Sequence, residues 1–265
     1  MVDLHVHTNC SDGTYDPSTI VEMAQQAGLQ SLAITDHDTL DAYTQISHIQ
    51  TEVQIIKGIE MTLDYDGAEI HLLGLHISAK DEGLITYTEM FKERRRVRGL
   101  QIIDKCRKLG YGLSDQEVEP LLSGKASIGR AHIARLLVAS GYFPTVSAVF
   151  KTILGINGSA YIPNNKLSVQ DGIELIHHAG GIAVVAHPII IKQSLLDLLR
   201  LPVDGLEVYH PKQIGKYDEY RAMAMERGLM ISGGSDFHGT PDRYPCQLGV
   251  FDVAEKWVEK IVKYR

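Results

Sequence analysis

Short apolar segments recur along this chain, and most of them end in a residue type that can bind a metal ion. Seven such segments begin near residues 2, 31, 53, 69, 182, 205 and 229. Their alternation with helical patterns is typical of an α/β fold made of parallel βα units, whose strands bring their carboxyl ends to one face. We therefore expect the polar residues at these ends to form one site. Because seven strands fall short of the usual eight, we expect an irregular or incompletely closed barrel.

The first segment shows this pattern most clearly. Apolar and polar residues alternate over Val2–Val6, so His5 and His7 share one face of the expected strand. Two imidazoles at this spacing can bind one metal ion, but a strand with two solvated histidines is an equal alternative for so short a motif. Further ligand-type groups after later segments favour the metal site. They are Asp36-His37-Asp38, Glu60, His71, His187, His210 and Asp236-Phe237-His238.

These ligand types also restrict the metal. Histidine, aspartate and glutamate without thiolates form sites suited to Zn, Mn or Fe. The groups are too many for one ion, and neighbouring ions need a bridging carboxylate, for which Glu60 is the natural candidate. If Asp12, Glu60 and Asp236 are ionised and the histidines are neutral, three divalent ions leave a surplus of about three positive charges. Such a site favours an anionic substrate.

The composition excludes several other classes of protein. The chain has 265 residues, 44% hydrophobic and 22% charged, with a net charge of −7, which describes a soluble globular protein without a general surface for long nucleic acid. Its three cysteines form no CxxC pair, which favours a reducing compartment. No apolar stretch reaches the roughly 18 residues of a membrane span, and the N-terminus does not resemble a signal peptide. We expect a cytoplasmic protein that binds no membrane, and its oligomeric state stays open.

The strand pattern is interrupted between Asp81 and Lys166. Helical segments take its place, expected near residues 82–109, 114–122, 128–139 and 145–153. A helical insertion is the simplest account. We therefore expect residues 1–80 and 167–265 to form the barrel, and residues 81–166 to form a helical cap for substrate recognition.

The motifs HVHTNCSDGT, TDHD, GIE, EIHLLG, AHP and GGSDFHG closely resemble those of the polymerase and histidinol phosphatase (PHP) superfamily of metal-dependent phosphoesterases. The order and approximate spacing match along essentially the whole chain. The resemblance implies an irregular seven-stranded (βα) barrel of PHP type with a helical insertion and a centre of two to three divalent ions, Mn, Fe or Zn. It also implies three ligand sets. They are His5, His7, Glu60 and Asp236 for the first ion, Glu60, His71 and His187 for the second, and Asp12, His37 and His238 for the third.

The insertion carries a narrower resemblance. Residues 127–136 and 160–163 are similar to a bacterial group that includes nucleoside 3′,5′-bisphosphate phosphatases and short-RNA exonucleases. Ser127 can cap a helix whose free N–H groups favour phosphate, with Arg130 and His132 beside it, so we expect these residues and Arg135 to bind substrate. The alternative is a surface arginine on a short helix. The arginine-rich run 94–98 is interpreted as a solvated face, with a substrate-facing arginine as the minority alternative.

The expected reaction is hydrolysis of a nucleotide phosphate monoester by a hydroxide that bridges two ions. Asp12 and Glu60 are the catalytic carboxylates, and His210, for which the implied ligand sets have no vacancy, is assigned to proton transfer or phosphate contact. A supporting structural role for His210 is the alternative. The narrower resemblance implies a nucleoside 3′,5′-bisphosphate as the substrate, which would lose its 3′-phosphate.

Several other functions remain open at this stage. A 5′-3′ exoribonuclease acting on short 5′-phosphorylated RNA would use the same mechanism. A histidinol-phosphatase-like enzyme, or a metal hydrolase of amides or lactones, could use the same ligands. A non-catalytic module that keeps metals for stability predicts gaps in the ligand set, and the sequence has none.

Overall fold

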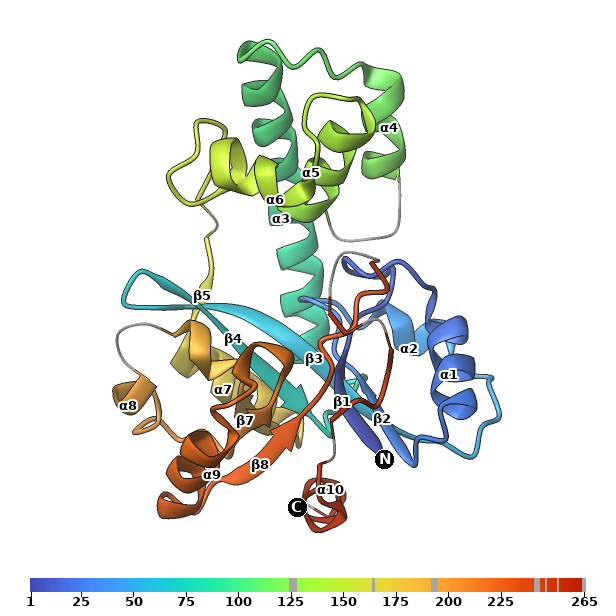
Figure 1. Cartoon of the computed structure of the whole chain (residues 1–265), viewed down its shortest axis with the longest axis vertical. Coiled ribbons are helices and arrows are strands. Elements are labelled where there is room, and N and C mark those ends of the chain that lie inside the picture. Colours follow the sequence, from blue (N-terminus) through green and yellow to red (C-terminus); the bar gives the residue numbers. More distant parts are fainter. Residues whose placement is uncertain are drawn as a thin grey trace. The chain divides into compact units, whose positions relative to one another are not determined.

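The computed structural model describes residues 1–123, 128–163, 165–191, 195–240, 244–245, 247–251 and 253–263. The chain divides into two compact units. The barrel unit comprises Met1–Thr88 and Lys166–Arg265, and the helical unit comprises Glu89–Asn165. Helix α3 (Glu82–Lys108) begins in the barrel unit and continues into the helical unit (Figure 1).

The barrel unit is built on one sheet with the strand order β1-β2-β3-β4-β6-β7-β8. The bounds of these strands are Val2–Val6, Ser31–Ile34, Gln54–Tyr65, Ala68–Leu75, Ile182–Val185, Gly205–Tyr209 and Met230–Gly233. The short strand β5 (Leu167–Ser168) pairs with β3 outside this order. The two end strands approach each other, because the His7 N–H donates to Phe237 O at 3.0 Å and the Asp236 N–H donates to His5 O at 2.9 Å. The sheet is therefore a nearly closed, seven-stranded barrel.

The expectation of parallel units throughout is wrong for β4. This strand is antiparallel to both β3 and β6. Strand β3 continues to Tyr65, where Asp66 and Gly67 turn the chain back. Both turn residues have positive φ, 50° and 81°, as the type I′ turn of a two-residue β-hairpin requires. An Asp-Gly dipeptide between two apolar segments is a sequence signal for a hairpin. A hairpin makes β4 antiparallel to β3.

Helices flank the strands of the barrel unit. They are α1 (Pro17–Gln26), α2 (Asp41–Gln45), α7 (Val169–His178), α8 (Leu195–Leu198), α9 (Tyr217–Glu226) and α10 (Glu255–Val262), with short 3-10 turns η2 (Pro188–Ile190) and η3 (Pro211–Gln213). Asp16 caps α1 by accepting the Thr19 N–H at 3.0 Å, and Pro17 occupies its first turn, as the sequence pattern predicts. Helix α10 was not predicted. Its Val258 and Ile261 pack on the core cluster that contains Val2 of β1 and Leu75 of β4, so α10 covers the end of the barrel at which the parallel strands begin and β4 ends.

The helical unit has its own core. Helix α3 is followed by α4 (Asp115–Ser123), α5 (Arg130–Ala139), α6 (Val146–Val149) and the π-helix η1 (Phe150–Leu154). These elements confirm the four predicted helical segments. The core includes Ile102 and Cys106 of α3, Ile133 and Leu137 of α5 and Leu154 of η1. Among the described residues of both units, no helix combines the length and the apolar character that crossing a membrane requires.

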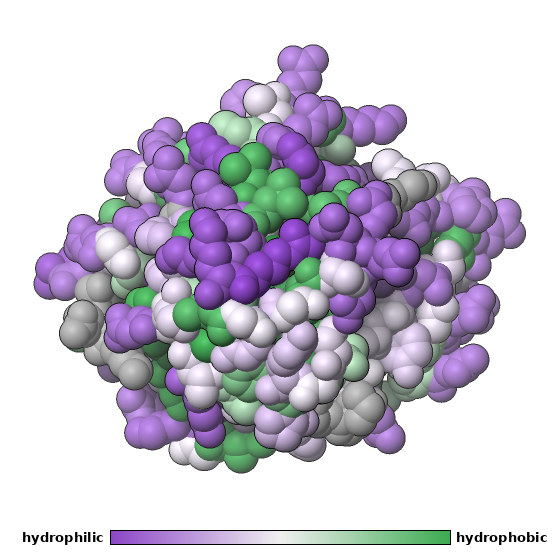
Figure 2. Space-filling view, turned by 90° about the horizontal axis from the view of Figure 1, so that it is seen from above, coloured by the Kyte–Doolittle hydropathy of each residue, from purple (hydrophilic) through white to green (hydrophobic). Residues whose placement is uncertain are grey.

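Exposed apolar side chains are scattered over the described surface. The face in Figure 2 is largely hydrophilic, with small hydrophobic areas between the polar residues. Isolated exposures such as Ile156, at 70%, and Met225, at 65%, are ordinary at protein surfaces. The unusual feature of the molecule is instead a buried group of histidines and carboxylates inside the barrel unit.

Candidate metal centre

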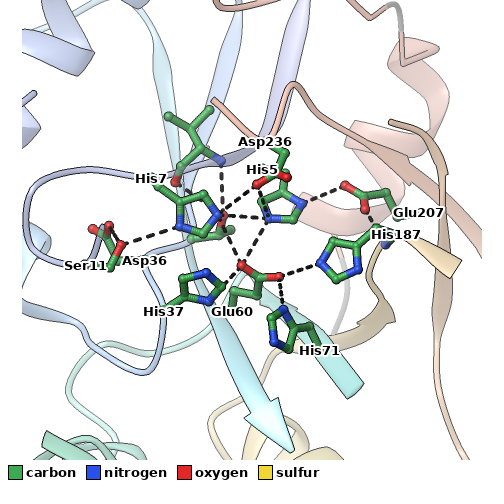
Figure 3. Close-up of polar contacts among 12 residues, drawn as sticks. His5, His7, Ser11, Asp36, His37, Glu60, His71, His187, Glu207 and Asp236 are labelled. Atoms are coloured by element: carbon green, nitrogen blue, oxygen red, sulfur yellow. Dashed lines mark hydrogen bonds and ion pairs between the residues drawn. The ribbon is translucent and has the colours of Figure 1, made fainter. Parts of the chain in front are cut away.

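All nine side chains implied as metal ligands lie together in the barrel unit. His5 is on β1, Glu60 on β3 and His71 on β4, and the others follow the carboxyl ends of strands. The others are His7 and Asp12 after β1, His37 after β2, His187 after β6, and Asp236 and His238 after β8. Segments far apart in sequence thus bring their polar side chains to one place (Figure 3).

Glu60 lies at the middle of this group. Its Oε1 is 2.8 Å from His71 Nδ1 and 2.9 Å from His187 Nε2. Its Oε2 faces a different set of nitrogens, His37 Nδ1 at 3.1 Å, His7 Nε2 at 3.2 Å and His5 Nε2 at 3.3 Å. The two oxygens of one carboxylate therefore point to separate groups of imidazoles, which is the arrangement that a bridging ligand needs.

A second carboxylate collects the remaining ligands. His238 Nε2 is 3.0 Å from Asp12 Oδ1, and His7 and His37 are each 3.9 Å from the same oxygen. These four residues form one of the groups whose ligand atoms all lie within 4.8 Å of one another. His7 and His37 therefore lie near both Asp12 and Glu60. The resemblance instead implies that each of these histidines belongs to one ligand set.

The arrangement of donor atoms fits cations. His5 Nε2 and His7 Nε2 are only 3.1 Å apart, and His5 Nδ1 is held by Glu207 Oε1 at 2.8 Å. His238 Nδ1 must donate to the Asp236 carbonyl at 2.8 Å, so its Nε2 presents a lone pair toward Asp12. Within the described part of the chain, Glu60 Oε2, His37 Nδ1 and His238 Nε2 are buried without a hydrogen bond. Buried lone pairs that face one another need a positive ion between them.

The charges of the site support the same interpretation. Burial raises the pKa of Glu60, but His37, His5 and His71 outweigh it and hold that pKa well below its usual range. Burial likewise opposes ionisation of Asp12, and His238 and His37 hold its pKa well below the usual range. Both carboxylates are therefore anionic at neutral pH and available to divalent cations.

His210 lies beside this centre but faces it as a donor. Its Nδ1 accepts the Lys212 backbone N–H at 3.1 Å, so the neutral ring carries its hydrogen on Nε2. Nε2 is 3.2 Å from Asp236 Oδ2. Distance alone groups His210 with His5 and Asp236 as possible ligands. The tautomer favours a hydrogen bond to Asp236 instead, because metal binding through Nε2 needs a lone pair on that atom.

Two further buried carboxylates, Asp36 and Glu207, lie near the ligands and bind hydrogen-bond donors of the protein. Asp36 belongs to a predicted ligand group, but it accepts the Thr8 N–H at 2.7 Å and the Ser11 hydroxyl at 2.5 Å. Glu207 was not predicted at all, yet it contacts His5 directly. The signal for Glu207 was a single glutamate inside an otherwise apolar strand, GLEVY, where it is fully buried.

The residues predicted to bind substrate lie in the helical unit, and their local geometry differs from the expectation. Ser127 lies outside the described residues. Helix α5 begins at Arg130, and its N-cap is Gly129. A helix capped by Ser127 would begin at residue 128, two residues earlier. His132 Nδ1 accepts the Gly129 N–H at 3.0 Å, and Arg135 is half-buried on the same helix. His132 therefore caps the start of α5 from its own third position, through the N–H of Gly129.

Aromatic rings hold the arginines of this unit. The Arg130 guanidinium lies 5.6 Å from the centroid of Tyr161 and 5.8 Å from that of Phe150. Arg98 lies 5.9 Å from the Tyr161 centroid, and its Nε donates to a backbone carbonyl at 2.7 Å. Stacking of this kind fixes a guanidinium in place without using all of its donors.

The arginine-rich run is not a uniformly solvated face, which corrects the sequence interpretation. Arg96 is exposed and pairs with Glu93, whereas Arg95 and Arg98 are half-buried. A Cβ at Gly129 would lie 3.5 Å from Arg95 Nη1, so Arg95 lies beside the start of α5. We name Arg95, Arg98, Arg130 and His132 the arginine cluster. Arg95 lies beside the α5 N-terminus, and Arg98 and Arg130 share the Tyr161 ring, so three cationic groups gather in this part of the helical unit.

Known proteins resemble the chain over most of its length. The PHP domain family matches residues 3–263. The chain is 34% identical over 248 residues to the 5′-3′ exoribonuclease Rnm of Salmonella typhimurium, covering 89% of this chain and 84% of that protein. It is 26% identical over 254 residues to the 3′,5′-nucleoside bisphosphate phosphatase of Chromobacterium violaceum, covering 89% and 87%.

A solved structure agrees with these sequence relatives. It is the crystal structure of a candidate metal-dependent phosphoesterase from Bifidobacterium adolescentis. It superimposes with a TM-score of 0.83 at 28% identity, covering 98% of this chain and 95% of that protein. Because the family match spans nearly the whole chain and the buried donor set fits divalent cations, the chain belongs to the PHP family and is a metal-dependent phosphoesterase.

Proposed function

We propose that this phosphoesterase removes the 3′-phosphate of nucleoside 3′,5′-bisphosphates. The observation that carries the proposal is the presence of two separate features suited to anions. One is the ligand group around Glu60 and Asp12, which fits divalent cations. The other is the arginine cluster of the helical unit. A substrate with two phosphates would use both.

The nine ligands would hold two to three ions of Mn, Fe or Zn. Bound ions supply a nucleophilic water near neutral pH and neutralise charge on the phosphoryl group. Glu60 presents one anionic oxygen to each group of histidines. His210 holds a proton on Nε2 at 3.2 Å from Asp236 Oδ2, and we assign it to proton transfer to the leaving alkoxide or to contact with the phosphate.

The arginine cluster would hold the phosphate that is not cleaved. Arg130 is oriented by two aromatic rings, and an oriented guanidinium matches two phosphate oxygens at once. Binding energy from this remote group can orient the phosphate under attack. A bisphosphate should therefore exceed either monophosphate mainly in kcat/KM.

A second candidate is a 5′-3′ exoribonuclease that acts on short 5′-phosphorylated RNA. The specific observation in its favour is the 34% identity to the exoribonuclease Rnm, against 26% to the bisphosphate phosphatase. The same two anion-binding features would serve it, with the 5′-phosphate on the arginine cluster and the first internal diester at the metal centre.

The deciding experiment compares adenosine 3′,5′-bisphosphate, 3′-AMP, 5′-AMP and a 5′-phosphorylated short RNA at equal concentration with Mn²⁺ added. The proposal predicts the highest kcat/KM for the bisphosphate. Equal turnover of either monophosphate would refute the two-anion argument. A higher kcat/KM on the RNA than on the bisphosphate would select the exoribonuclease.

A further inference from the structure

Strand β7 brings Glu207 to the metal centre, where both of its carboxylate oxygens are engaged. Oε1 accepts the His5 Nδ1–H at 2.8 Å, and Oε2 accepts the backbone N–H of His187 at 2.6 Å. Glu207 and His5 are 0% exposed, and His187 is 4% exposed. Figure 3 shows Glu207 beside these two residues. With one donor on each oxygen, the carboxylate contacts two of the nine ligands through both of its oxygens.

The contact with His5 determines which ring nitrogen is free. An ionised carboxylate only accepts hydrogen bonds, so His5 must carry its hydrogen on Nδ1. Its Nε2 is then a lone pair, 3.3 Å from Glu60 Oε2 and 3.1 Å from His7 Nε2. Glu207 thus prepares His5 in the form that binds a cation.

The contact with His187 determines a backbone conformation. His187 has φ 31° and ψ 60°, in the left-handed region that residues with a Cβ rarely adopt. Its N–H is held by Glu207, and in this conformation its Nε2 lies 2.9 Å from Glu60 Oε1. The same carboxylate therefore orients a second imidazole, which comes from another strand and faces the other oxygen of Glu60.

We propose that Glu207 is a positioning residue that prepares His5 and His187 together for the metal ions. The inference rests on the metal centre of the proposed function. Glu207 binds no ion and touches no substrate. It acts by fixing the tautomer of one ligand and the backbone of the other, so its loss should weaken metal binding while the groups that contact substrate stay intact.

The substitution Glu207→Gln tests this with little change in volume. An amide offers one acceptor and one donor, so it can satisfy His5 or His187 but not both. If its NH₂ faces His5, the ring must move its hydrogen to Nε2 and loses the lone pair that faces the ions. If its NH₂ faces His187, two donors meet. Loss of such a supporting contact typically weakens metal binding by about 10- to 100-fold.

The chain offers a matched control in Asp204. Its Oδ2 lies 2.7 Å from His177 Nε2 and accepts the Ala183 N–H at 2.7 Å. This is the same pair of contacts, a histidine ring and a backbone N–H, made by residues that are not among the ligands. Asp204→Asn should therefore leave the affinity for Mn²⁺ within twofold of the unmodified protein.

The measurement is a titration of the metal-free proteins with Mn²⁺, in which free Mn²⁺ is followed by electron paramagnetic resonance. Activity at rising Mn²⁺ is measured in parallel. We expect Glu207→Gln to raise the Kd for Mn²⁺ about 10- to 100-fold and to regain most of its kcat when Mn²⁺ is saturating. Because Mn²⁺ that binds the folded state would also offset a folding defect, affinities are compared only between variants that are folded without metal. Thermal melting of the metal-free proteins shows whether each variant is folded.

Three results would overturn the inference. They are a Glu207→Gln affinity within twofold of the unmodified protein, an equal loss in Asp204→Asn, and a kcat that saturating Mn²⁺ does not restore. If Glu207→Gln does not fold, Glu207→Asp replaces it. The aspartate keeps both acceptor oxygens, but its side chain is one methylene shorter, so they lie farther from His5 and His187. The same loss of affinity is expected. Failure of the unmodified protein to bind Mn²⁺ would instead contradict the metal centre of the proposed function.

Discussion

Glu60 joins the two groups of imidazoles through its two oxygens, so its charge decides whether neighbouring cations can be held there. Glu60→Gln keeps the shape of the side chain but removes that charge. We predict that the variant loses bound metal and activity together, measured by elemental analysis and by phosphate release. Asp64→Asn is the control, because Asp64 lies on the same strand and accepts the Gly67 N–H of the hairpin. Full activity in Glu60→Gln would remove Glu60 from the centre.

The arginine cluster gives a second prediction at the level of single residues. Arg130→Ala removes the guanidinium that lies between Phe150 and Tyr161, but it leaves every ligand in the barrel unit in place. We expect kcat/KM for a bisphosphate to fall about 10- to 150-fold, as for loss of a charged hydrogen bond worth about 1.5–3 kcal/mol, with metal content unchanged.

The control for Arg130 is Arg96→Ala. Arg96 is exposed and pairs with Glu93 one turn away on the helix surface, so its loss should change kcat/KM less than twofold. Unchanged kinetics of Arg130→Ala on every phosphorylated substrate would exclude Arg130 from substrate binding.

The β3–β4 hairpin is the element that sets Glu60 against His71. Pairing of Thr62 with His71 places these strands in register, and the register depends on the turn at Asp66 and Gly67. Gly67 has φ 81° with open space around its Cβ position, so only backbone strain opposes a side chain there. We predict that Gly67→Ala lowers the free energy of unfolding by about 1–2 kcal/mol, measured by urea denaturation.

Gly67→Asn provides the comparison, because asparagine tolerates the left-handed conformation. It should retain nearly all of the stability and metal content of the unmodified protein. Equal stability of the alanine and asparagine variants would show that the turn does not constrain the hairpin.

Elements also show what the sequence could predict. The HxH spacing on β1 and the motifs after later strands predicted which side chains lie together in the candidate metal centre, because ligand chemistry depends on short local patterns. Strand direction could not be predicted in the same way, since an apolar run looks the same in parallel and antiparallel sheets. Only the Asp66-Gly67 dipeptide indicates the reversal of the chain. Glu207 was missed because a strand glutamate is usually solvated, and only the tertiary structure shows that it is buried.

At the scale of the whole molecule, the division into two units has a consequence for metal-linked stability. Ions should stabilise the barrel unit, which holds the ligands, more than the helical unit. Each unit contains a buried reporter. Burial raises the pKa of the Cys10 thiol in the barrel unit to about 12 and that of Cys106 in the helical unit to about 11. Thiols with these pKa values react slowly with alkylating agents until their surroundings open.

We therefore predict that Mn²⁺ at about 100 times its Kd slows alkylation of Cys10 in mild urea about 100-fold, corresponding to about 2.7 kcal/mol. Alkylation of Cys106 should change much less. Cys246, which lies outside the described residues, is replaced by serine in this experiment. Peptide mass spectrometry distinguishes the two remaining thiols. Equal protection of both would mean that the units open as one.

The central claim is that the buried donor set of the barrel unit holds more than one cation and that these cations are needed for phosphoester hydrolysis. The most direct test is elemental analysis of fully active protein, with activity followed as the metal is removed by a chelator and added back. The account predicts two to three transition-metal ions per chain, and activity that is lost and regained with them. One ion or fewer in fully active protein would contradict it.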